Sequence, residues 1–66
     1  MKTIIIDTDT LNNGADLDAM REAIEREVFG VEVEFKSTGA GTEFRGFDDA
    51  DEARATVRAI VDRLDF

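Results

Sequence analysis

The sequence predicts a single α+β domain, residues 1–66, with the element order β-α-β-β-α. Its length of 66 residues accommodates one small domain. Two segments show the apolar spacing of amphipathic helices, and three show the β-branched or alternating pattern of strands. Because each predicted helix has a single apolar stripe, both should pack on one face of a three-stranded sheet.

The first half of the chain is expected to form a strand and a helix. Lys2–Thr8 contains three consecutive isoleucines, which favour a strand. Asn13 is the predicted N-cap of a helix that runs to about Phe29, and Gly30 follows where a left-handed residue would end it. The apolar stripe of this helix consists of Leu17, Met20, Ile24 and Val28.

The second half is expected to form a hairpin and a second helix. Within residues 31–36, apolar and charged residues alternate, as in a strand with one wet face. Ser37–Gly41 is the predicted hairpin turn, and Thr42–Phe47 is the return strand. Asp48 is the predicted cap of a helix over about 49–64. Its stripe consists of Ala50, Ala53, Val57, Ile60 and Leu64.

These elements suggest a mixed sheet. A right-handed crossover would make the first two strands parallel. The hairpin would add an antiparallel third strand, which could take the central position in the sheet. The layout resembles a ferredoxin-like α+β sandwich without its last strand. The predicted core consists of Ile4, Ile6, Leu17, Met20, Ile24, Val28, Val31, Val33, Phe35, Phe44, Val57, Ile60 and Leu64.

The composition excludes several kinds of chemistry. The chain has no cysteine and no histidine, which excludes disulfides, thiol catalysis, Cys/His metal sites and imidazole acid–base catalysis. We therefore expect no enzyme activity, no metal and no cofactor. No leader is expected, and no apolar run approaches the roughly 20 residues of a membrane span. A cytoplasmic location fits these features.

Charge is the most distinctive property. Sixteen acidic residues face eight basic ones, for a net charge of −8. Direct binding to nucleic acid or to anionic lipid is not expected, because both require a basic patch. A basic protein surface is the favoured partner. The predicted fold places Glu32, Glu34 and Glu43 on the open sheet face, with Lys36, Arg45 and Ile5.

The topology also predicts acidic residues at both ends of the molecule. One end should gather Asp7, Asp9, Asp16 and Asp18, with Asp62 and Asp65 nearby. The other end should gather Glu25, Glu27, Asp48, Asp49, Asp51 and Glu52. The residues predicted to bind a partner are Glu32, Glu34, Glu43, Asp7, Asp9, Asp16, Asp18, Asp48, Asp49, Asp51 and Glu52.

One short segment resembles a catalytic motif. Asp7-Thr8-Asp9-Thr10 is similar to the first motif of haloacid-dehalogenase-type phosphatases, which would make Asp7 a nucleophile and Asp9 a general acid. Leu11 departs from that motif, and the sequence lacks the rest of the family's machinery. The segment also departs from a calcium loop, which needs glycine and glutamate where Asn12 and Asp18 stand. We expect polar residues of a strand exit and turn.

The exposed aromatic residues form a further candidate contact. Phe47 and Phe66 are the two that we expect to be partly exposed and open to a partner. Without neighbouring cations, a base-stacking platform of phenylalanines would repel phosphates.

Small size, the lack of catalytic residues, the charge of −8 and a compact α/β layout resemble acidic phage-encoded anti-CRISPR inhibitors that block DNA entry to type I surveillance complexes. The resemblance spans the chain and is one of class, without a diagnostic motif. It implies a non-enzymatic, monomeric inhibitor that presents a DNA-like negative surface in the host cytoplasm. Its partner would be a basic nucleic-acid-binding protein or complex.

Two other interpretations remain open. A small housekeeping domain of a halophile would have the same acidic surface for solubility, and it should lose its fold at low salt. A protein–protein interaction module such as an antitoxin would use the open sheet face or an edge strand. Substitution of Glu32, Glu34 and Glu43 would then abolish binding while the fold is retained.

Overall fold

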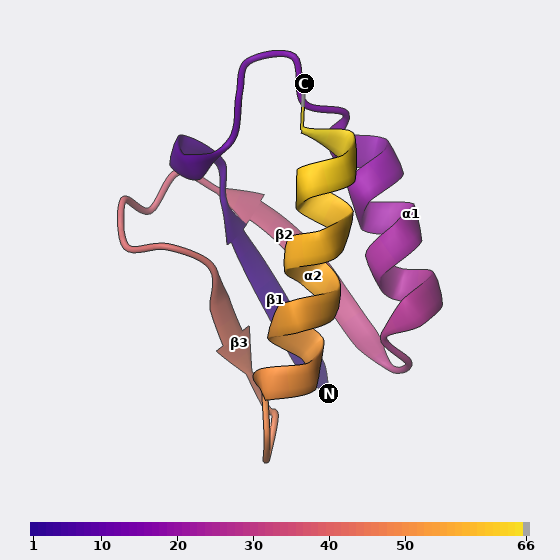
Figure 1. The fold of residues 1–66 in the computed structure, drawn as a ribbon. Helices are drawn as coiled ribbons and strands as arrows, with labels where there is room; N and C mark the ends of the chain where they lie inside the picture. The colour runs from indigo at the N-terminus through magenta and orange to yellow at the C-terminus, as the bar shows by residue number, and fades with distance from the viewer. Residues whose placement is uncertain (66) are drawn as a thin grey trace.

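The computed structural model describes residues 1–65, which form three strands and two α-helices (Figure 1). The elements in chain order are β1 (Lys2–Asp7), a 3₁₀ turn (Thr8–Thr10), α1 (Leu17–Glu27), β2 (Val31–Lys36), β3 (Glu43–Arg45) and α2 (Asp51–Leu64). The predicted β-α-β-β-α order and the α+β class are confirmed. None of the helices in this part of the chain has the length and apolar character needed to cross a bilayer.

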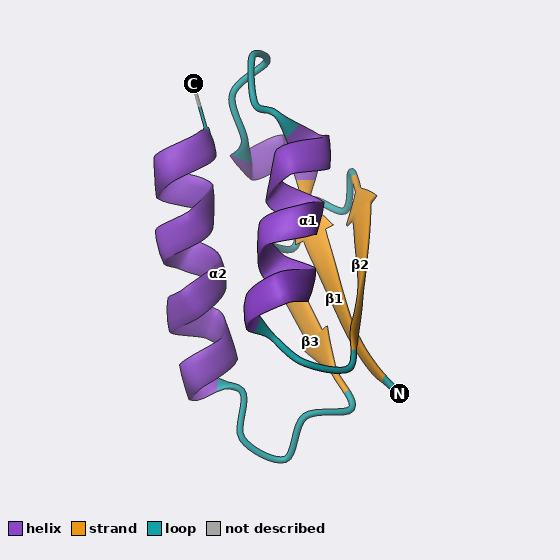
Figure 2. Ribbon diagram, turned by 90° about the vertical axis from the view of Figure 1, so that its right-hand side faces the viewer, coloured by secondary structure: helices purple, strands orange, loops and turns teal. Residues whose placement is uncertain are grey.

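The elements form two layers. Figure 2 shows both helices on the same face of the sheet, as predicted. The core between the layers is made by aliphatic side chains that the sequence pattern identified. Its fully or almost fully buried members include Ile4, Ile6, Ile24, Val33, Val57 and Ile60.

The central strand is β1. The strand order is β2-β1-β3, with β1 parallel to β2 and antiparallel to β3. The expected hairpin is therefore wrong: β2 and β3 do not pair, and residues 37–42 cross the end of β1 instead. The physical reason lies in the isoleucines of β1, which are buried on both faces of the sheet. Such a strand is favoured in the centre, where neighbours shield both its edges.

Two of the predicted helix caps are also wrong. The N-cap of α1 is Asp16, whose carboxylate accepts a hydrogen bond from the Ala19 N–H at 3.0 Å, whereas Asn13 lies exposed in the preceding loop. At α2 the N-cap position is Ala50, which has no capping side chain. Asp49, not Asp48, supplies the nearby carboxylate, which accepts from the Asp51 N–H at 3.0 Å. Capping depends on the local backbone path, which residue spacing does not define.

The predicted core needs three additions. Ala23 and Ala53 are buried on the same helix faces as the larger aliphatic residues. Ile5 belongs to the open sheet face, yet its side chain is only 3% exposed. Several predicted core residues instead lie at the margin and are half-buried: Leu17, Val28, Val31, Phe35, Phe44 and Leu64.

Candidate functional site

Asp7 is the one buried charged side chain among the described residues, with 1% exposure. Its carboxylate accepts hydrogen bonds from the Gly41 N–H at 2.9 Å, the Asp9 N–H at 3.0 Å and the Thr38 N–H at 3.2 Å. The bonds from Gly41 above all, then Asp9 and Thr38, lower the pKa of Asp7 to about 2, although burial acts in the opposite direction. Asp7 thus ties the 37–42 connection to the end of β1.

The carboxylate of Asp7, which the sequence predicted as a partner contact, is instead buried and directed to backbone groups inside the fold. Asp9 lies beside this anchor, where its carboxylate accepts from the Ser37 hydroxyl at 2.6 Å. Within residues 1–65, no three acidic side chains lie where they could hold a metal ion together.

The carboxylates at the start of α1 largely support local structure. Asp16 caps the helix, and the Asp65 carboxylate accepts from the Asn12 N–H at 2.8 Å. That bond joins the end of α2 to the loop before α1, so the predicted proximity of these segments is confirmed. Asp18 and Asp62 are exposed. This end of the molecule offers a partner fewer unoccupied carboxylates than its composition suggested.

The open sheet face is close to neutral. Register places Glu34, Ile5 and Glu43 in one row across the three strands. Arg45 forms an ion pair with Glu43, with 2.9 Å between Nε and Oε1. Lys36 forms a second ion pair with Glu34, with 3.8 Å between Nζ and Oε1. The hydrogen bond from Arg45 lowers the pKa of Glu43. No helix covers Ile5 on this face, so its burial must come from the side chains beside it.

Two of the three acidic residues predicted to bind a partner on this face are thus paired within the chain. Only Glu32 among them is free of an ion pair in the described residues, and it is exposed. The negative field that the sequence suggested for the open face is correspondingly weaker.

The opposite end of the molecule keeps its carboxylates free. We call it the acidic pole and define it as Glu25, Glu27, Asp48, Asp49, Asp51 and Glu52. All six are exposed, and none forms an ion pair with the described residues. Figure 1 shows why they gather: α1 ends and α2 begins at the same end of the sandwich. Among these six side chains, only that of Asp49 forms a hydrogen bond with the described residues: its carboxylate accepts from the Asp51 N–H in the first turn of α2.

More of the basic side chains lie over aromatic rings than form ion pairs with carboxylates in the described residues. Three of the eight basic side chains lie over aromatic rings, at 4.7–5.5 Å from the ring centre. These pairs are Arg54 with Phe44, Arg21 with Phe35, and Lys2 with Phe47. Of these three, Lys2 also lines a groove with Glu27, Asp49 and Glu52, so one ammonium offsets part of the negative charge of the acidic pole.

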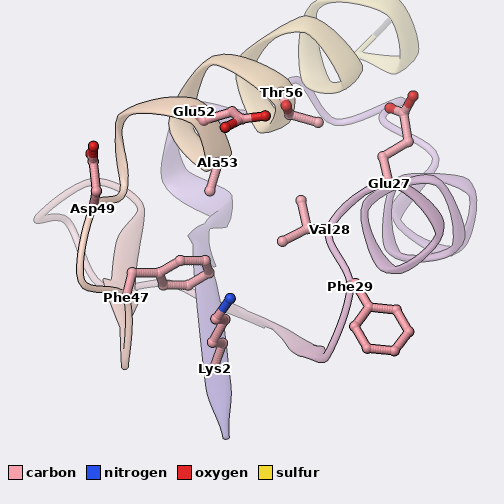
Figure 3. Close-up of a pocket in the computed structure, with 9 residues that line it drawn as sticks. All are labelled: Lys2, Glu27, Val28, Phe29, Phe47, Asp49, Glu52, Ala53 and Thr56. Carbon is pink, nitrogen blue, oxygen red and sulfur yellow. The ribbon is translucent and has the colours of Figure 1, made fainter.

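A groove of about 280 Å³ opens at the acidic pole (Figure 3). It lies between the end of α1, the start of α2 and the start of β1. The side chains of Val28, Phe47 and Ala53 point into it. The complete lining is Lys2, Glu27, Val28, Phe29, Phe47, Asp49, Glu52, Ala53 and Thr56.

Phe29 is the aromatic residue that sequence reasoning missed. It is 94% exposed at the rim of the groove, with its ring pointing outward. Phe47 is half-buried and packs edge-on against Phe44 at 5.8 Å, and Phe66 lies outside the described residues. A signal was present: Phe29 follows Val28 and is out of phase with the apolar stripe of α1.

Comparison with protein-family models, with curated proteins and with solved structures finds no match to this chain. Its function must therefore be inferred from its own residues. The described residues present exposed carboxylates, an apolar-floored groove and an exposed aromatic ring, which are features that can contact another molecule.

Proposed function

We propose that the protein binds a basic surface through which its partner normally holds nucleic acid, and that it inhibits the partner by occupying that surface. The observation that supports this is the small number of internal ion pairs. Of sixteen acidic residues, all within 1–65, only Glu34 and Glu43 form ion pairs there. The net charge of −8 is thus displayed at the surface, where it acts on other molecules.

Electrostatic attraction is the driving force of this proposal. The molecule is 31 Å long, and a DNA duplex of that length has roughly 18 phosphate charges at one per 1.7 Å. A net charge of −8 reaches somewhat under half of this density. Such a field steers association with a basic channel and makes the affinity depend on salt. The paired open face points to the acidic pole as the contact, rather than to all faces equally.

The resemblance to acidic anti-CRISPR proteins supplies a concrete partner to try, a type I surveillance complex. In the test, this complex is bound to fluorescein-labelled target DNA and titrated with the protein at increasing salt. We expect displacement of the DNA at low salt, with competition that weakens steeply as the salt concentration rises toward about 0.5 M.

Two double variants locate the contact. Asp48→Asn with Glu52→Gln removes two charges from the acidic pole, and Glu22→Gln with Asp62→Asn removes two exposed charges elsewhere. The first pair should weaken competition about tenfold, the usual scale for the loss of central interface contacts, and the second pair much less. If both double variants weaken competition equally, the effect depends on net charge alone and the acidic pole is not the contact.

A basic nucleic-acid-binding protein panel extends the test beyond one complex. Binding that persists at about 1 M salt and ignores added DNA would overturn the proposal and favour an ordinary interaction module such as an antitoxin. Absence of competition with every basic partner, together with unfolding at low salt, would overturn it in favour of a halophilic domain.

A further inference from the structure

We propose that the groove at the acidic pole receives an arginine side chain from a basic, partly apolar segment of a partner protein, with Phe29 packing beside it. This inference rests on the proposed function in one respect only, that the partner is basic. It adds which type of side chain the groove binds, whereas the proposed function requires only that the partner surface is basic.

The size and floor of the groove fit one long side chain. Its volume of about 280 Å³ is below the roughly 300–1,000 Å³ typical of small-molecule pockets. Val28, Phe47 and Ala53 form an apolar floor between the two helices. The aliphatic stem of an arginine or lysine packs on such a floor while its charged end stays at the rim.

The charges at the rim select a cation. Glu27 and Glu52 come from different helices and stand on either side, with Asp49 nearby. Lys2 is the one basic residue in the lining, and its Nζ lies 5.5 Å from the centre of the Phe47 ring. Three acidic residues and one basic residue thus line the groove, so the lining has a net negative charge that complements an incoming cation.

The position of Glu27 is electrostatically unfavourable for its own helix. It is the last residue of α1, where the helix dipole disfavours an anion, whereas the acidic residues in the first turn of α2 are favoured. A contribution to stability therefore accounts for Asp51 and Glu52 but not for Glu27. Contact with a partner's cation would account for it.

Phe29 supplies the apolar half of the contact. A ring that is 94% exposed gains nothing for the fold, and exposed aromatic residues are the typical anchors of protein interfaces. Its position at the rim lets a partner cover the ring and fill the groove together. Arginine fits better than lysine because its planar guanidinium pairs in bidentate fashion with carboxylates and stacks on aromatic faces.

The probe for this inference is a short peptide of alternating arginine and leucine residues, titrated into the ¹⁵N-labelled full chain. We expect the largest amide shifts at residues 27–29 and 52–56. A peptide with neutral citrulline in place of arginine should bind at least tenfold more weakly, and a lysine peptide should fall between the two.

Variants separate the groove from the general charge. Phe29→Ala and Glu27→Gln should each lower the peptide affinity about fivefold to tenfold. Glu22→Gln, which removes one exposed charge from the middle of α1, should leave the affinity within about twofold. Because Phe29 and Glu27 are exposed, far-ultraviolet circular dichroism should be unchanged in all three variants.

The outcomes distinguish this inference from the proposed function. Shifts centred on the sheet face, equal binding of the citrulline peptide, or no effect of Phe29→Ala would overturn the arginine groove, even if DNA competition is observed. Groove binding that follows the expected pattern without any DNA competition would support the arginine groove and overturn the nucleic-acid-site proposal.

Discussion

Asp7 shows how much one side chain can do at the residue scale. In the sequence it stands at the head of a segment that resembles a phosphatase motif. In the fold it accepts three backbone N–H groups and holds the 37–42 connection over the end of the central strand. Two of those donors, Thr38 and Gly41, are more than 30 residues away in sequence, so no local pattern could reveal them.

Asp7→Asn should destabilise the protein at neutral pH and flatten its response to acid. The asparagine amide would present an NH₂ group to backbone N–H donors that require an acceptor. Because the folded pKa of Asp7, about 2, lies below its ordinary value of 3.8, its contribution is complete above pH 3.8 and is lost as the pH falls through about 2. Urea unfolding between pH 7 and pH 2 measures both effects.

The control for this prediction is Glu22→Gln, which removes an exposed carboxylate from the middle of α1. The difference between wild type and Asp7→Asn should shrink as the pH approaches 2. A difference that stays constant over the whole range would show that the ionised carboxylate is not what holds the connection.

At the element scale, the N-termini of the two helices differ in how their acidic residues are used: one carboxylate, that of Asp16, caps α1, whereas the N-cap position of α2 has no capping side chain. Both starts lie among acidic residues, and the composition of the two segments is similar. The difference arises from the path of the preceding loop, which positions Asp16 for the Ala19 N–H.

Asp16→Ala should lower the free energy of unfolding by about 1 kcal/mol, whereas Asp16→Asn should cost only a few tenths, because asparagine caps a helix about as well as aspartate. The asparagine variant removes the charge while the cap is retained, so it also tests whether Asp16 contacts a partner. Chemical denaturation measures the stability of each variant. Equal losses in the two variants would show that charge, rather than the hydrogen bond, is what Asp16 contributes.

At the scale of the whole molecule, the distribution of negative charge depends on where the basic side chains lie, and five of the eight have partners on the sheet face or over aromatic rings. Two basic residues pair on the sheet face, and three lie over aromatic rings at the edges of the core. At the acidic pole, Lys2 lines the groove with Glu27, Asp49 and Glu52, but none of the six acidic residues forms an ion pair with the described residues, so most of the negative charge there is uncompensated. In a chain of 66 residues with a thin core, this repulsion is a substantial fraction of the stability.

Raising the salt concentration from about 0.02 M to about 0.5 M should increase the free energy of unfolding by about 1 kcal/mol, because salt screens exposed like charges. The double variant Asp48→Asn with Glu52→Gln should gain less than the wild type. Circular dichroism at a series of salt concentrations measures the trend. A chain that is unfolded at about 0.1 M salt and folds only near molar salt would instead match a halophilic domain.

Residue spacing was sufficient to predict the element order, the two-layer packing and most of the core, because local periodicity defines which face of each helix and strand is apolar. It was not sufficient to identify β1 as the central strand, the burial of Asp7 or the pairing of Glu34 and Glu43 with neighbouring cations. These features depend on contacts between segments distant in the chain. Charge and composition follow from the residues alone, whereas the location of free charge, at the acidic pole beside Phe29, arises only when the ends of α1 and α2 meet.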